Sequence, residues 1–280
     1  MKKPLWRLAR LMIFLMIYPL SKRLQHKQIP VLAYHSVDNH IVSPFSVTTG
    51  KFLRQIRYLK DSGYQSISLH ELVAHVQGRS QTVGQKSIVL TFDDGFKHFY
   101  TNVLPVLKRY GFSAVLAVVT DFCNNGRTDS YHKESPVPAL SWDEIRHICA
   151  EGIEIASHSM SHVELTSMPL EQANWEIRKS KKETEAAINT EVNFFCYPHG
   201  VYNEQIVDLV KRSGYKAAIT TNPGLVRKRD DIYRLKRVPV SPDFSLMEFK
   251  AVLTRAVEWY SSLLWGKTGQ ALGFGRVEIF

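Results

Sequence analysis

The stretch SIVLTFDDGF, residues 87–96, joins an apolar run to two neighbouring carboxylates and a glycine. The run Ile88-Val89-Leu90 predicts a short buried strand. Asp93 and Asp94 follow it closely, and buried neighbouring anions repel each other unless a cation, a shared proton or water lies nearby. In an extended segment their side chains point to opposite sides, so that one can bind a cation while the other faces water. A simple turn is the alternative, because Asp-Asp-Gly is also a common loop sequence.

Short apolar runs of this kind recur along the chain and alternate with segments of helical periodicity. Seven or eight repeats of strand and helix favour an α/β fold whose mostly parallel strands close into a barrel. In such barrels the reactive groups lie where strands end and loops begin. The predicted strands lie near residues 31–34, 65–69, 87–92, 113–119, 153–157, 193–197, 216–221 and 237–240, and helices are predicted around 52–59, from Pro169 to about Ile188 and from Asn203 to Gly214.

Histidines stand at two other predicted strand ends. The segment ASHSMSH, residues 156–162, sets His158 and His162 four residues apart. On one helical turn, or in a tight loop, their imidazoles can converge on a single ion. His35 ends the first predicted strand in AYHSV, residues 33–37, and is expected to face the same cavity as the aspartates. The alternatives are an incidental histidine pair and a strand-end histidine bonded to a backbone carbonyl.

Taken together, TFDDG, SHSMSH and FFCYPHG resemble, in order and spacing, the polysaccharide deacetylases of carbohydrate esterase family 4, the NodB homology domain. The resemblance extends from about Pro30 to about Val240, and AYHSV is similar to the branch that contains the poly-N-acetylglucosamine deacetylases. It implies a distorted (β/α)7-type barrel and a metal-dependent hydrolase that removes N-acetyl groups from an amino sugar in a polysaccharide or glycolipid. The alternatives are a deformylase or amidase acting on a lipid-linked sugar, and a catalytically inactive barrel that binds saccharide.

The same resemblance implies a role for each motif residue. The metal is usually zinc, with cobalt or nickel as alternatives, and a site with three protein ligands leaves positions for water and substrate. Asp93 matches the general base, and His35 matches the acid that protonates the departing amine. The backbone N–H of His199 is expected to help hold the oxyanion. The implied metal ligands are Asp94, His158 and His162.

The chain departs from the family pattern at the segment that often reads R-x-P-Y. Cys196 stands in the place of the arginine, which orients the base in the family, and His199 stands in the place of the tyrosine. Arg237, in the segment LKRVPV, is a candidate substitute that precedes the last predicted strand. The alternative is that Arg237 is an ordinary solvated surface residue.

The net charge of +10 is concentrated at the N-terminus, where seven Lys and Arg residues precede the first acidic residue. The rest of the chain carries +3, which argues against a broad electrostatic surface for nucleic acid. The charges flank the apolar stretch 11–20, which is too short to span a bilayer. Residues 1–28 are therefore expected to form an apolar helix on a membrane surface, with a cleaved signal peptide and a buried helix as the alternatives.

These patterns predict a chain in three parts. Residues 1–28 are expected to associate with a membrane, 29–265 to form the deacetylase-like barrel with its core motifs at 86–240, and 266–280 to form a tail. The expected location is the bacterial inner membrane, on its cytoplasmic face, because three irregularly spaced cysteines are poor material for disulfides. An N-acetylated saccharide or glycolipid is the expected substrate. The sequence makes no prediction of the oligomeric state.

Overall fold

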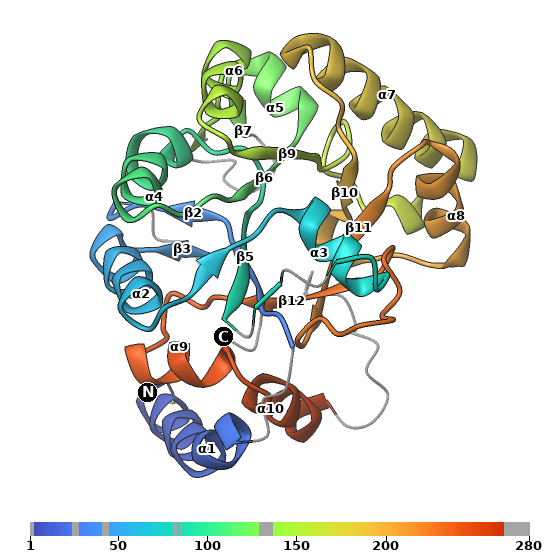
Figure 1. The fold of residues 1–280 in the computed structure, drawn as a ribbon. Helices are drawn as coiled ribbons and strands as arrows, with labels where there is room; N and C mark the ends of the chain where they lie inside the picture. The colour runs from blue at the N-terminus through green and yellow to red at the C-terminus, as the bar shows by residue number, and fades with distance from the viewer. Residues whose placement is uncertain are drawn as a thin grey trace.

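A closed barrel of parallel strands forms the centre of the molecule, as predicted (Figure 1). The computed structural model describes residues 3–23, 28–40, 45–80, 83–84, 86–128 and 137–265. Within them, the ring runs in the order β1, β12, β11, β10, β9, β6 and β5, and β5 pairs back to β1. The strand bounds are β1 Val31–Tyr34, β5 Ser87–Phe92, β6 Val115–Val118, β9 Glu154–Ser157, β10 Phe194–Cys196, β11 Ala217–Pro223 and β12 Leu235–Pro239.

Most strand boundaries differ from the predicted ones by one or two residues, and two of the differences change the local structure. The strand predicted at 65–69 is only β4 (Gln65–Ser66), which pairs with the first residues of β5. Ser68 then caps helix α3, because its hydroxyl accepts a hydrogen bond from the Glu71 N–H and the Glu71 carboxylate accepts one from the Ser68 N–H. The last strand, β12, begins at Leu235, two residues before the predicted range, so Arg237 lies in the middle of the strand and does not precede it.

Helices surround the barrel, and the three predicted from the sequence are present. Helix α2 buries Phe52, Ile56 and Leu59 at the predicted spacing. Pro169 and Asn203 stand at the N-caps of α7 and α8. The helix bounds are α2 Thr49–Asp61, α3 Leu69–Val76, α4 Leu104–Tyr110, α5 Thr120–Asn125, α6 Trp142–Ala150, α7 Leu170–Ile188, α8 Glu204–Arg212, α9 Leu246–Val252 and α10 Ala256–Trp265.

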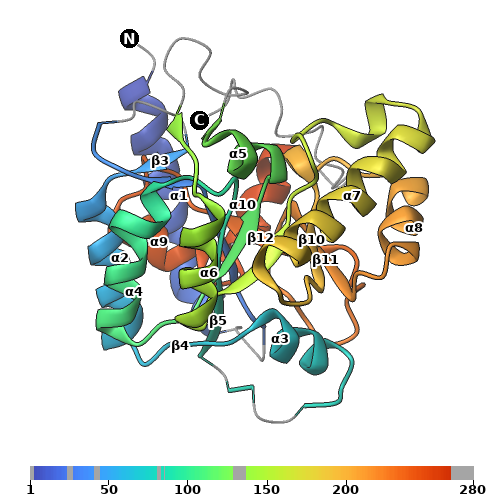
Figure 2. The same ribbon diagram turned by 90° about the horizontal axis from the view of Figure 1, so that it is seen from above.

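Alternate side chains of the barrel strands belong to two separate apolar cores. Along β5, Ile88, Leu90 and Phe92 belong to the larger core, which fills the space between the barrel and the surrounding helices. Val89 belongs to the smaller core inside the barrel, which includes the buried residues of α3. Helix α3 closes the end of the barrel at which the strands begin (Figure 2). The other end, where the strands finish, is left for polar side chains.

Short elements follow the strand ends. Strand β2 pairs with β3, and β7 pairs with β8. The bounds of these short elements are β2 Ser36–Val37, β3 Ser46–Val47, β7 Arg127–Thr128, β8 Val137–Pro138, the π-helix η1 Phe99–Val103, and the 3-10 helices η2 Leu165–Ser167 and η3 Pro198–Gly200.

The N-terminal helix α1 (Lys3–Arg23) packs against α9 and α10, on the side away from the barrel (Figure 1). Phe14 is fully buried, with its ring centroid 4.7 Å from that of Tyr260. Arg10 is buried as well, and its Nε donates a 2.6 Å hydrogen bond to the carboxylate of Glu248 on α9. Helix α1 is therefore attached to the rest of the protein by both apolar and ionic contacts.

The membrane contact expected of residues 1–28 stays a prediction. Residues 24–27 of that segment and the predicted tail, 266–280, lie outside the described residues. Each helix in the described ranges is too short or too polar to cross a membrane.

Replacing Arg10 with Met should lower the free energy of unfolding by about 3–5 kcal/mol, because the buried Glu248 carboxylate then loses its cation. Arg57→Met is the matched control. Arg57 pairs with Asp61, but these side chains are 72% and 69% exposed, and such a surface pair contributes about 0–1 kcal/mol. Urea unfolding followed by circular dichroism measures both losses. Equal losses would show that the ion pair does not hold α1 in place.

Candidate active site

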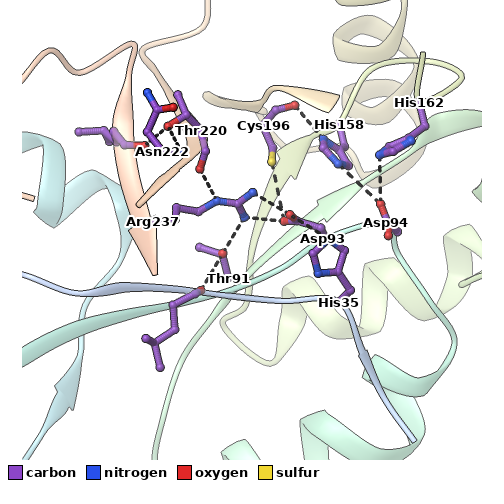
Figure 3. A network of polar contacts seen from close by, with 12 residues as sticks. His35, Thr91, Asp93, Asp94, His158, His162, Cys196, Thr220, Asn222 and Arg237 are labelled. Carbon is purple, nitrogen blue, oxygen red and sulfur yellow. Dashed lines mark hydrogen bonds and ion pairs between the residues drawn. The ribbon is translucent and has the colours of Figure 1, made fainter. Parts of the chain in front are cut away.

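The residues singled out from the sequence meet at the end of the barrel where the strands finish (Figure 3). His35 follows β1, Asp93 and Asp94 follow β5, and His158 follows β9. Arg237 lies near the end of β12. Because parallel strands all finish at the same end of a barrel, side chains that are distant in the sequence become neighbours there.

Asp94, His158 and His162 form a compact, buried set of potential metal ligands. Nε2 of His158 lies 3.6 Å from Oδ1 of Asp94, and Nε2 of His162 lies 3.4 Å from the same oxygen. Zinc bonds of about 2.0–2.2 Å in a tetrahedral arrangement place neighbouring ligand atoms about 3.3–3.6 Å apart. The observed separations therefore match those expected around one bound ion.

The chemistry of these side chains also fits a cation. Oδ1 of Asp94 is buried and has no hydrogen-bond partner among the described residues, which is costly unless a positive ion faces it. Nδ1 of His158 donates to the carbonyl of Cys196 at 2.8 Å, so Nε2 keeps its lone pair on the side of Asp94. Burial lowers the pKa of His158 to about 4 and that of His162 well below its usual range. Both imidazoles are therefore neutral near pH 7, the form that binds metal.

Asp94 itself needs a positive neighbour in order to be ionised. Burial raises the pKa of Asp94 well above its usual range, and the Asp93 carboxylate raises it further. A divalent cation beside the carboxylate reverses both effects, because its charge favours the ionised form.

A second group of potential ligands, Asp93, His158 and Cys196, makes a poorer metal site. Asp93 already forms an ion pair with Arg237. Burial raises the pKa of the Cys196 thiol well above its usual range, so the thiolate that binds metal is disfavoured. The group around Asp94 is therefore the better metal site.

Arg237 forms a two-pronged ion pair with Asp93 (Figure 3). Its Nη1 and Nη2 donate to Oδ1 and Oδ2 of Asp93, both at 2.8 Å. Nε donates to the Thr220 carbonyl at 2.7 Å, and Nη1 also donates to Oγ1 of Thr91 at 3.0 Å. The alternative that Arg237 is a solvated surface residue is wrong, because the side chain is 0% exposed and is fixed by bonds on both edges of its plane.

This ion pair keeps Asp93 ionised. Burial raises the pKa of Asp93, but the charge and hydrogen bonds of Arg237 outweigh burial and hold the pKa well below its usual range. Sγ of Cys196 lies 3.7 Å from Oδ1 of Asp93. The cation that contacts Asp93 thus comes from β12, and Cys196 supplies only a thiol beside it.

His35 is the other basic side chain beside Asp93. Its Nε2 lies 3.9 Å from Oδ2 of Asp93, and the side chain is 25% exposed. Burial lowers the pKa of His35, and the Asp93 carboxylate opposes this shift. His35 is therefore more accessible to solvent than the buried carboxylate beside it.

His199 lies next to the metal-ligand set. Its Nε2 donates to the carbonyl of His162 at 3.2 Å, and the two ring centroids are 4.5 Å apart. The following residue, Gly200, has a φ of 70°, and a Cβ there would lie 1.8 Å from Oγ1 of Thr221. Only glycine fits this position, which fixes the turn that carries His199. The expected oxyanion contact of the His199 backbone N–H stays a prediction.

Backbone strain is concentrated at this site. Six described residues other than glycine have a positive φ. Left-handed conformations of this kind cost energy and persist where the surrounding structure holds them, commonly at functional sites. Four of the six belong to the site, with φ between 57° and 76°: Asp94, Ser159, His162 and His199.

The left-handed backbone explains why the side chains of Asp93 and Asp94 point in different directions. It corrects the expectation that the alternation of an extended strand would separate them. Asp94 is left-handed, so the turn at Asp94, and not the alternation of an extended strand, directs its carboxylate toward the histidines.

His158 and His162 converge through a tight loop and not on a helical turn. Within that loop, Oγ of Ser159 accepts a 3.0 Å hydrogen bond from the His162 N–H.

Glu176 holds the histidine loop from α7, and it was not predicted. One carboxylate oxygen accepts hydrogen bonds from the N–H groups of Met160 and Ser161 at 2.9 and 3.0 Å, and the other accepts one from the Ser161 hydroxyl at 2.6 Å. The sequence feature that could have identified Glu176 is its position in the buried stripe of α7, where it lies between the apolar residues Ala173 and Ile177. A carboxylate in such a stripe indicates a buried hydrogen-bond acceptor.

Comparisons with known proteins agree with this geometry. Residues 80–218 match the family described as polysaccharide deacetylase. YxkH of Bacillus subtilis (strain 168), assigned to the polysaccharide deacetylases, is 29% identical over 226 residues, which are 81% of this chain and 76% of that protein. The poly-β-1,6-N-acetyl-D-glucosamine N-deacetylase of Escherichia coli (strain K12) is 24% identical over 261 residues, 80% of this chain and 38% of that protein.

A solved structure supports the same likeness. The Streptococcus pyogenes deacetylase PplD in complex with acetate superposes with a TM-score of 0.69 and is 26% identical, covering 79% of this chain and 96% of that chain. The family match contains both aspartates and all the site histidines except His35. His35 and Arg237 lie outside the matched residues, so their place in the site rests on the contacts described above.

Glu176→Ala should weaken metal binding by about 10–100-fold, as expected when a group that orients a ligand loop is removed. Competition with a chromophoric chelator measures the affinity for zinc. Glu183→Ala on the same helix is the matched control, because Glu183 is paired with Lys179 at the surface. The zinc affinity of this variant should equal that of the parent protein. An unchanged affinity in Glu176→Ala would exclude a positioning role for Glu176.

Proposed function

Because the chain belongs to the polysaccharide deacetylase family, we propose that it hydrolyses the N-acetyl groups of an N-acetylglucosamine polysaccharide with the help of a divalent metal ion, zinc first. The family makes it a hydrolase of N-acetyl amide bonds. The proposal adds the polymer and the metal, and it assigns a role to each side chain of the site.

The observation that carries the proposal is the different environment of the two neighbouring aspartates. Asp94 faces two neutral imidazoles, whereas Asp93 is held ionised by Arg237. Amide hydrolysis at a metal needs both arrangements: a ligand set for the ion and a separate base for the proton of water. Since all these side chains are present and oriented, an inactive saccharide-binding barrel is the weaker alternative.

A metal ion bound by Asp94, His158 and His162 would supply Lewis-acid chemistry, which polarises the amide carbonyl and makes water more acidic. Asp93 accepts the proton of the attacking water. Arg237 donates hydrogen bonds to both carboxylate oxygens, so Asp93 keeps its orientation and its charge until it accepts that proton.

His35 is placed to return a proton to the departing amine. Its lowered pKa makes the imidazole neutral near pH 7, so it first takes up the proton that Asp93 has received. The 3.9 Å between the two groups is too long for a direct hydrogen bond, so we propose that one water carries the proton across. The backbone N–H of His199 is our proposed donor to the oxyanion, in a turn that Gly200 fixes.

The substrate we favour is β-1,6-linked poly-N-acetylglucosamine, because a deacetylase named for that polymer matches 80% of this chain. The chain corresponds to 38% of that relative's length, and we propose the hydrolytic step alone. A glycolipid that carries the same N-acetyl sugar is the second substrate class, in keeping with the expected location at the bacterial inner membrane. A formyl group on such a sugar would require the same chemistry.

Purified protein with zinc or cobalt should release acetate from β-1,6-linked N-acetylglucosamine oligomers. Asp93→Asn should lower kcat by about 10²–10⁴-fold and keep its metal, because it removes the base and leaves the three ligands. Asp94→Ala should lose both activity and metal. Enzymatic determination of acetate, with metal content measured on the same samples, tests all three expectations. Release of formate from N-formyl sugars without any acetate release would favour the deformylase, and no release from any oligomer or glycolipid would reject the proposal.

Arg237→Met should lower kcat by about 10²-fold or more at unchanged metal content, because Asp93 loses the cation that orients and ionises it. Arg237→Lys should recover part of the loss, since it restores the charge but not the two-pronged contact. Thr220→Val is the matched control: it keeps the backbone carbonyl that accepts from Arg237, so its kcat should be close to that of the parent protein. Circular dichroism verifies that each variant is folded. Full activity in Arg237→Met would contradict the positioning role.

A further inference from the structure

The inward side of helix α1 combines apolar side chains with two buried polar ones. Arg10 and Ser21 are buried at 1% and 0% exposure. Arg10 pairs with Glu248 of α9, and the Ser21 hydroxyl lies 2.7 Å from that of Thr254, in the turn between α9 and α10. Phe14 is fully buried on this side, and Ile13, Ile17 and Tyr18 pack against the core and are partly buried. A helix at a protein surface normally carries polar and charged residues on the side that faces solvent.

The side of α1 that faces solvent is apolar as well. Half of the ten large hydrophobic side chains that are exposed in the described part of the chain belong to this one helix. Their successive spacings of four, three, one and four residues place them on one side of the helix, away from Arg10, Phe14 and Ser21. We call this side the outer face of α1; it consists of Leu8 (59% exposed), Met12 (52%), Leu15 (43%), Met16 (77%) and Leu20 (55%).

The charged residues of α1 that border the outer face have one sign. Lys22 and Arg23 follow it and are exposed, and Arg7, which pairs with Asp243, precedes it. The first acidic residue of the sequence is Asp38, so the helix has no carboxylate of its own. An apolar side bordered by Lys and Arg is the pattern of a helix that lies in the interface of a bilayer with anionic lipids.

The direction of α1 places the active site relative to this face. Arg7 forms an ion pair with Asp243, in the loop that follows β12 at the catalytic end of the barrel, whereas Ser21 contacts Thr254 after α9. Helix α1 therefore runs along the side of the barrel, starting at the catalytic end (Figure 2). A bilayer in contact with the outer face would run along that side, and the active site would open parallel to the bilayer surface.

We propose that the outer face of α1 docks on the surface of an anionic bilayer, and that the docked enzyme deacetylates glycans attached to that same bilayer. The second clause rests on the proposed deacetylase function. The single sign of the bordering charges favours lipid over a second copy of the chain, because two such faces would bring like charges together. Self-association is therefore an outcome that the test must separate.

Sedimentation with vesicles tests the docking. The full-length protein should bind vesicles of mixed phosphatidylglycerol and phosphatidylcholine, and bind those of phosphatidylcholine alone more weakly. Met12→Gln/Met16→Gln should reduce binding by about tenfold or more, since it places polar groups at the centre of the outer face. Leu170→Gln/Trp175→Gln is the matched control, because these residues of α7 are also exposed, at 43% and 53%, but on another side of the barrel.

Two results would overturn the docking: equal vesicle binding by the parent protein and Met12→Gln/Met16→Gln, or no binding by the parent protein. A parent dimer that this variant converts to a monomer, with no vesicle binding, would assign the outer face to a second copy. Size-exclusion chromatography with light scattering distinguishes that case.

Acetate release separates the docking from the proposed function. With soluble N-acetylglucosamine oligomers, Met12→Gln/Met16→Gln should match the parent protein, because no residue of α1 belongs to the site. With the same oligomers tethered to lipid in the anionic vesicles, the variant should be about tenfold slower or more. Equal rates on tethered oligomers would overturn the second clause alone. No release by the parent protein from either substrate would reject the proposed function and leave the sedimentation result to decide the docking.

Discussion

The bidentate ion pair between Asp93 and Arg237 is the interaction on which the rest of the site depends. Two neighbouring buried carboxylates cannot share one cation and still have separate roles. Arg237 neutralises Asp93 and fixes both of its oxygens, so Asp94 alone remains for the two histidines and a metal. Arg237 lies on β12 and Asp93 follows β5, and the two strands are joined through β1, which pairs with both. Closure of the ring therefore brings Arg237 to Asp93 and keeps the carboxylate ionised when it is buried.

A second set of contacts positions the loops of the site and takes no part in the proposed reaction. Glu176 binds the loop between His158 and His162, and the close approach of Gly200 to Thr221 fixes the turn at His199. Left-handed residues recur in these same turns. Each costs energy, and the buried hydrogen bonds around them offset that cost. The arrangement is preorganised, with the ligand atoms already at the spacing of a bound ion.

The barrel and most of the site could be predicted because both depend on local patterns. A strand buried on both faces is a continuous apolar run, and a reactive residue at its end stands next to that run in the sequence. The contacts made by Arg237 could not be read in this way, because they depend on closure of the ring. Glu176 could not be read either, since its partners are backbone N–H groups of a distant loop. The separation of Asp93 and Asp94 was expected for a wrong reason, because the left-handed turn at Asp94 is invisible in its sequence.

The fold alone does not explain the outer face of α1. The inward side of the helix is already occupied by Phe14, by the partly buried Ile13, Ile17 and Tyr18, and by the ion pair between Arg10 and Glu248, whose attraction roughly balances the cost of removing both charges from water. The outer face leaves Leu8, Met12, Leu15, Met16 and Leu20 in contact with water, although burying apolar area is worth about 25 cal/mol per Å². A surface helix selected for folding alone would carry polar residues on its solvent side. The outer face of α1 is therefore better explained by what it contacts outside the protein than by the fold.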